Sequence, residues 1–146
     1  MKGISMRVSY FCFIAAVCAA LMGMSLGIVM GIRQDFSLAP AHAHLNLLGW
    51  VTMALFGLYH RGIERPSERL AWVQAVSGTV GFVLMAGGLA IYLGLGVESA
   101  VGSVIAGSML CLLSMLLFLV IVVGDLARTA KDRRNQALSR PAPGLA

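Results

Sequence analysis

The three histidines of this 146-residue chain all lie in one apolar segment, residues 39–61, which reads APAHAHLNLLGWVTMALFGLYHR. Imidazole is the side chain most often used to bind a metal or to carry a proton near neutral pH. In a regular helix, at about 100° per residue, His44 points about 200° away from His42. His44 and His60 would lie about 24 Å apart along the helix axis. The spacing therefore predicts separate roles for the three side chains.

The helical stripe that begins at His42 carries small and mildly polar side chains. Its members are His42, Asn46, Gly49, Met53, Gly57 and His60. Such a stripe is typical of a surface that packs against other helices in a membrane. We expect His42, at the helix start, to face water or lipid headgroups. His60 is followed directly by Arg61 and is expected to be an interfacial side chain whose polar tip reaches the headgroups.

The His44 stripe places an imidazole above branched aliphatic side chains, those of Leu48, Val51 and Leu55. A nitrogen ligand beside a dry, apolar wall is what the edge of a haem requires. An ionisable side chain one turn inside a membrane helix is costly, which marks it as a candidate functional residue. We therefore predict that His44 is a ligand. Trp50 is expected to pack within the bundle or to neighbour the cofactor.

The composition indicates that lipid surrounds these elements. Hydrophobic residues make up 59% of the chain and charged residues 12%, and the mean hydropathy is +0.88. A soluble domain of this length could not bury so much apolar surface. The three cysteines, Cys12, Cys18 and Cys111, lie in apolar runs and are expected to act as small hydrophobic residues. The net charge of +5 comes from residues that flank the apolar runs, so no nucleic-acid partner is expected.

Four apolar runs are long enough to cross the roughly 30 Å of hydrocarbon in a bilayer. They span about 8–32, 40–60, 70–96 and 100–124. The first run is longer than the apolar core of a signal peptide, so we expect it to be retained. Short connections make consecutive helices antiparallel neighbours. The predicted fold is all-α, an integral membrane four-helix bundle over residues 1–127, followed by a basic, disordered tail over 128–146.

Basic residues give the orientation of the predicted spans. Of the 11 Lys and Arg residues, all but Arg33 lie in the N-terminus, the 61–69 loop or the tail. Because basic loops stay on the cytoplasmic side, both termini are predicted to be cytoplasmic. The protein is then a multi-pass protein of a bacterial-type inner membrane. His42 and His44 would lie at its outer surface.

Glycine recurs at every fourth position in the first run, at Gly23, Gly27 and Gly31. Small residues at this spacing let two helices approach closely in lipid. They could equally let a flat macrocycle lie against the helix. The sequence leaves both interpretations open.

The segment AHAHLNLLGWVTMALFG resembles the second transmembrane helix of subunit I of the haem–copper oxidase superfamily, in the cytochrome-c oxidase and nitric oxide reductase branches. The whole chain resembles small four-helix proteins related to a fragment of that subunit. The resemblance implies that His44 is an axial ligand of a low-spin haem b and that Asn46 supports it. It also implies electron transfer or haem sensing, with a respiratory redox partner.

The other helices contain no histidine, so the oxygen-reducing centre of that superfamily is not expected here. A second axial ligand could come from His44 of a second copy across a symmetric dimer interface. Otherwise the iron would be five-coordinate, or would bind Met30 or another methionine.

Two alternatives belong to other functional classes. An outer-face copper or zinc site could use His42 and His44 with Asp35 and Glu98, if the helix start is unwound. A cofactor-free accessory or assembly subunit of a respiratory complex would use the glycine stripes as its oligomer contact. Acid–base hydrolysis has little support, because no carboxylate pair occurs within the predicted spans.

Overall fold

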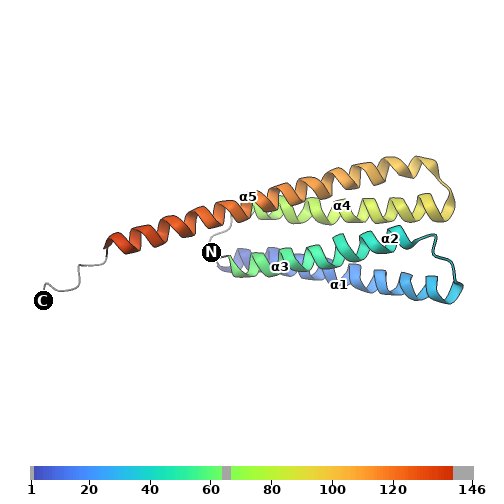
Figure 1. The fold of residues 1–146 in the computed structure, drawn as a ribbon, viewed down its shortest axis with the longest axis horizontal. Helices are drawn as coiled ribbons and strands as arrows, with labels where there is room; N and C mark the ends of the chain where they lie inside the picture. The colour runs from blue at the N-terminus through green and yellow to red at the C-terminus, as the bar shows by residue number, and fades with distance from the viewer. Residues whose placement is uncertain (1, 64–66, 140–146) are drawn as a thin grey trace, which may run out of the picture.

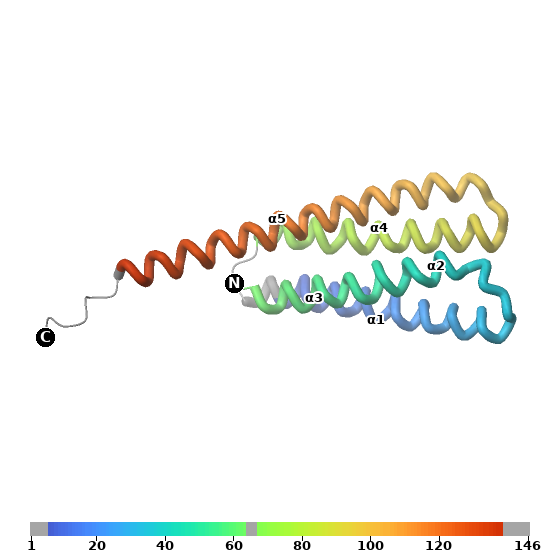
Figure 2. The backbone as a smooth tube through the Cα atoms, viewed as in Figure 1, coloured from blue at the N-terminus to red at the C-terminus, as the bar shows by residue number. Residues whose placement is uncertain are grey.

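The computed structural model describes residues 2–63 and 67–139, and all of its regular structure is helical. The first helix is α1 (Lys2–Arg33). A second continuous rod consists of α2 (Ala39–His44), a π-helix η1 (Leu45–Thr52) and α3 (Met53–Gly62). It is followed by α4 (Glu68–Leu95), a short 3-10 turn η2 (Glu98–Ala100) and α5 (Val101–Ser139). Figure 2 shows the second rod passing through η1 without a break.

The rods form two antiparallel hairpins that lie side by side (Figure 1). One hairpin pairs α1 with α2, η1 and α3, and the other pairs α4 with α5. The connections at 34–38 and 96–100 lie at one end, which we call the turn end. The start of α1, the end of α3 and the start of α4 lie at the other, the tail end, beyond which α5 continues alone. This confirms the predicted all-α fold with four helical rods.

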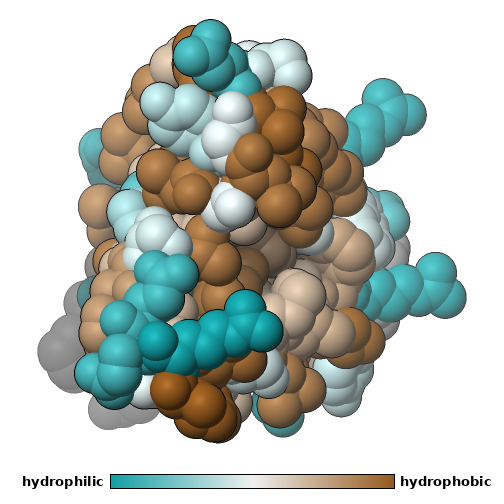
Figure 3. All heavy atoms as spheres, turned by 90° about the vertical axis from the view of Figure 1, so that its right-hand side faces the viewer, coloured by the Kyte–Doolittle hydropathy of each residue, from teal (hydrophilic) through white to brown (hydrophobic). Residues whose placement is uncertain are grey.

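Three helical segments are long and apolar enough to cross a membrane: Met6–Arg33, Glu68–Leu95 and Glu98–Leu138. Large apolar side chains also cover the outside of the bundle, including Ile14, Leu55 and Leu116. Seen from the turn end, apolar side chains reach the surface between the polar ones (Figure 3). A surface of this kind is stable in lipid rather than in water. The hydropathy of the helices therefore identifies a multi-pass membrane protein.

The core is built from small residues and a few rings. Cys12 and Ala19 of α1, Met53 of α3 and Phe82 of α4 are buried together. At Gly49, an added Cβ would lie 2.7 Å from Ala19 Cβ and 3.0 Å from a ring carbon of Phe82. Only glycine therefore lets the second rod approach α1 and α4 this closely at that level.

The last helix is longer than predicted, since α5 continues through the charged segment 128–139. That segment is rich in Ala, Arg, Lys, Gln and Leu, which favour helix. It contains no proline, and the first proline after it is Pro141. The predicted disordered tail thus differs from the structure over 128–139. The remainder of the prediction, 140–146, lies outside the described residues.

Candidate functional site

His44 is held by a hydrogen bond to its own helix. Its Nδ1 lies 2.7 Å from the backbone oxygen of Pro40. A carbonyl oxygen can only accept, so Nδ1 carries the proton and the Nε2 of the neutral ring keeps its lone pair. The same arrangement orients many metal-binding histidines, in which a backbone carbonyl fixes the tautomer and the ring. Pro40 lies in the first turn of α2, as its missing N–H favours.

The apolar wall predicted below His44 is divided between two faces. Val51 and Leu55 are 40% and 57% exposed and point out of the bundle. Leu48 instead lines a cavity of about 20 Å³ that also touches Cys111 and Met115 of α5. Four cavities of the described residues are lined by other side chains and not by His44. His44 itself is half-buried, and the exposed Val51 and Leu55 lie seven and eleven residues further along the rod.

The π-helix explains why the wall divides. Between Leu45 and Thr52 the backbone is wider than an α-helix, which changes the direction of every side chain that follows. The hydroxyl of Thr52 donates to the backbone oxygen of Leu47 at 2.8 Å, and Asn46 Nδ2 donates to that of His42 at 2.9 Å. These side-chain donors help to satisfy carbonyls at both ends of the widened segment. The residue spacing predicts a regular α-helix over this segment, so the π-helix differs from the prediction.

His42 packs inside the first hairpin. Its Nδ1 donates to the backbone oxygen of Gly23 in α1 at 2.9 Å. An added Cβ at Gly27 would lie 2.9 Å from His42 Cε1, and one at Gly23 would overlap the amide of Asn46. The packing role predicted for this stripe is confirmed. The structure differs from the expectation that His42 faces water or headgroups, because its half-buried ring bonds to the Gly23 carbonyl of α1.

His60 is the most enclosed histidine, with 0% of its surface exposed. Its Nε2 donates to Gln74 Oε1 at 2.9 Å, since the amide oxygen can only accept. Gln74 Nε2 donates to Ser114 Oγ at 3.2 Å, and Ser114 Oγ donates to the Gln74 backbone oxygen at 2.8 Å. The network joins α3, α4 and α5. The prediction that His60 is interfacial is therefore wrong.

Gln74 and Ser114 were missed because each is an isolated polar residue in an apolar run, WVQAVSG and CLLSMLL. Such residues in membrane helices commonly bond across to a neighbouring helix. Their presence was a usable signal. The sequence could not show which of the three histidines lies at the same depth in the bundle as Gln74 and Ser114.

The described residues contain no group of three or more His, Cys, Asp and Glu side chains that could hold a metal ion. His42 and His44 diverge, as the helical spacing predicted. Asp35 accepts a hydrogen bond from the Ser37 backbone N–H at 3.0 Å, which lowers the pKa of the Asp35 carboxyl. The copper or zinc alternative is therefore not assembled by the described part of one chain. Trp50 is 46% exposed and points outward from η1.

No protein-family model matches this chain, and comparison with curated proteins and with solved structures finds no match either. The resemblance to haem–copper oxidase subunit I stays a prediction from the residues of the second rod.

Proposed function

We propose that the protein binds haem b in the membrane, with His44 as an axial ligand, and that two copies share one haem. The observation that carries the proposal is the state of the His44 ring. Its Nδ1 donates to the Pro40 carbonyl, which leaves the Nε2 of the neutral ring its lone pair, and exposed apolar side chains follow further along the same rod. This set fits one half of a haem site: a nitrogen ligand with an oriented ring and a dry neighbouring surface.

The second half of the site is best supplied by another copy. Within the chain, His42 bonds to α1 and His60 bonds to Gln74. Met30, the methionine considered as a second ligand, is buried. A two-fold interface presents the same patch twice, so it would bring a second His44 and a second set of Val51 and Leu55 side chains to the opposite face.

The bound haem would supply a one-electron couple, and the chain's own residues would position it. His44 would hold the iron, Pro40 would keep the ring in its tautomer, and Asn46 would brace the start of η1 through its bond to the His42 carbonyl. The lone basic residue of the turn end, Arg33, indicates that this end faces outward and that both termini are cytoplasmic. Electron exchange with a respiratory partner would then occur near the outer surface of an inner membrane.

The experiment is a reduced-minus-oxidised optical spectrum of the purified protein, produced with ample haem. The native chain should show a sharp α-band, and His44→Ala should abolish it. His42→Ala is the matched control, because His42 is two residues away but bonded to α1, and this variant should keep the band. Monodisperse elution of both variants in size-exclusion chromatography, together with a native helix content by circular dichroism, would show that they fold.

Absence of an α-band in the native chain, or a band that survives His44→Ala, would refute the proposal. The cofactor-free accessory subunit would then be favoured. Its predicted oligomer contact would need another surface, because Gly23 and Gly27 are used inside the chain, against Asn46 and His42.

A further inference from the structure

Two adjoining cavities lie at the tail end, where α5 leaves the bundle. The larger, of about 510 Å³, is lined by charged side chains of α5, among them Lys131 and Asp132. The smaller, of about 150 Å³, is largely apolar and is lined by Leu70, Val120 and Ile121. The two cavities share Ile63, Asp125 and Arg128. Together they form one site with a charged part and an apolar part.

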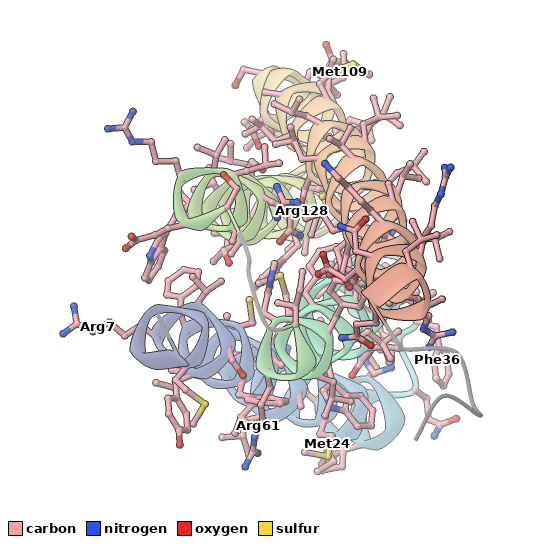
Figure 4. The ribbon with its side chains drawn as sticks, turned by 90° about the vertical axis from the view of Figure 1, so that its left-hand side faces the viewer. Arg7, Met24, Phe36, Arg61, Met109 and Arg128 are labelled. Carbon is pink, nitrogen blue, oxygen red and sulfur yellow. The ribbon has the colours of Figure 1, made fainter. Side chains whose placement is uncertain are left out.

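The site lies where the chain would cross the membrane surface. Residues 101–124 of α5 contain no charged side chain, and Asp125 is the first. The apolar cavity is lined by Val120 and Ile121, which precede Asp125 in α5, and the charged cavity by Lys131 and Asp132, which follow it. In Figure 4, which views the tail end, Arg7 and Arg61 point away from the bundle, whereas Arg128 lies toward the other helices. Arg128 lines both cavities, although its side chain is still exposed to solvent.

The charges that line the site favour a zwitterionic ligand over a purely anionic one. Arg128 and Lys131 are cationic, and Asp125 and Asp132 are anionic. A group that carries only negative charge would meet both carboxylates, whereas a zwitterion can pair its phosphate with the bases and its ammonium with the acids. Pairing of Arg128 with Asp132 along the helix would satisfy two of the four charges. This ion pair would not involve the charge of Lys131, and it would not fill the apolar cavity.

We propose that this composite site binds a phospholipid with a zwitterionic, phosphate-plus-ammonium headgroup, taken from the leaflet at the tail end. The headgroup occupies the charged cavity, and the first part of an acyl chain covers Leu70, Val120 and Ile121. The inference depends on the membrane placement of the helices and not on haem binding. Its test can therefore succeed or fail separately from that of the proposed function.

The experiment is native mass spectrometry of the full chain released from nanodiscs of equal parts phosphatidylethanolamine and phosphatidylglycerol. The native protein should retain phosphatidylethanolamine preferentially. Lys131→Ala and Asp132→Asn should each reduce that retention about fivefold, the value of one exposed ion pair. Arg133→Ala is the matched control, because Arg133 lies on the same helix segment but lines neither cavity, and it should not change retention.

A second arm distinguishes a lipid from a soluble headgroup. O-phosphoethanolamine, the headgroup without acyl chains, should not displace the retained lipid at equal concentration, because it cannot fill the apolar cavity. Preferential retention of phosphatidylglycerol would overturn the proposal. So would equal retention by the native protein and the Lys131→Ala, Asp132→Asn double variant, or displacement by the soluble headgroup.

Discussion

The histidines at the two ends of the second rod have opposite environments. At the tail end, His60 is enclosed by three helices and bonds to Gln74. At the turn end, the half-buried His44 bonds to Pro40 of its own helix, on a rod whose next outward-facing side chains are apolar. Both positions lie in one apolar segment of the sequence. The difference shows that neighbouring helices, rather than the local sequence, decide whether a membrane histidine holds the fold together or stays available to a ligand.

The cause is the path of α5. Near the tail end its Phe118 packs on Phe56 with ring centroids 4.6 Å apart, and its Asp125 accepts a hydrogen bond from the Tyr59 hydroxyl at 3.2 Å. Near the turn end, α2 packs against α1 and α4 instead. The His44 side of the rod is therefore left open there, where a second copy could dock.

The largest effect is expected from breaking the close α4–α5 contact, which lies in the half of that hairpin nearer the turn end. An added Cβ at Gly107 would lie 2.5 Å from the backbone nitrogen of Met85 and 2.6 Å from the backbone oxygen of Gly81. Backbone atoms cannot yield, so Gly107→Ala should reduce the free energy of unfolding by about 3 kcal/mol. Gly102→Ala, on the same helix with no atom within 4 Å of the added Cβ, should be neutral. Unfolding in mixed micelles measures both, and equal stability of the two variants would contradict the close packing.

The buried network should come next. His60→Leu leaves the buried Gln74 amide oxygen without its donor and should cost about 2 kcal/mol. The double variant His60→Leu, Gln74→Leu should recover part of that loss, because the unpaired amide is removed as well. His44→Ala should leave stability close to native in the same micelle titration. If His44→Ala reduced the free energy of unfolding as much as His60→Leu does, the distinction between the two ends would be contradicted.

A smaller effect is expected at Asn46, which braces the start of the π-helix. Asn46→Ala removes its bond to the His42 carbonyl and should reduce the free energy of unfolding by about 1 kcal/mol. In the haem-bound protein it should also shift the midpoint potential, which a redox titration followed at the α-band measures. An unchanged stability and an unchanged potential would remove Asn46 from the site.

The smallest effect concerns Asp35 in the turn between α1 and α2. The Ser37 N–H lowers its folded pKa below the 3.8 of an unperturbed Asp. A carboxyl group whose folded pKa is depressed stabilises the fold at pH values above its unfolded pKa. This stabilisation is lost as the pH falls through its folded pKa. The stability difference between the native protein and Asp35→Asn should therefore be present at neutral pH and vanish in acid. A difference that grows as the pH falls would have the wrong sign.

Periodicity and hydropathy were enough to predict the helical rods and the packing stripe of His42, because both depend on local spacing. The burial of His60 depends on Gln74 and Ser114, which are distant in sequence, so no local pattern could give it. The π-helix contains Gly49, which packs closely against Ala19 of α1 and Phe82 of α4, and it divided the apolar wall predicted for His44. The helical segment 128–139 could have been predicted from its residues, but its charge was interpreted as a sign of disorder.

The most direct test of the account is the ratio of haem to chain in the purified oligomer, measured by pyridine haemochrome with light scattering for the mass. If two copies share one haem through His44, the native protein should be a dimer with one haem, and His44→Ala should be free of haem. A native protein without haem, or a His44→Ala variant that keeps the native haem content, would contradict the account.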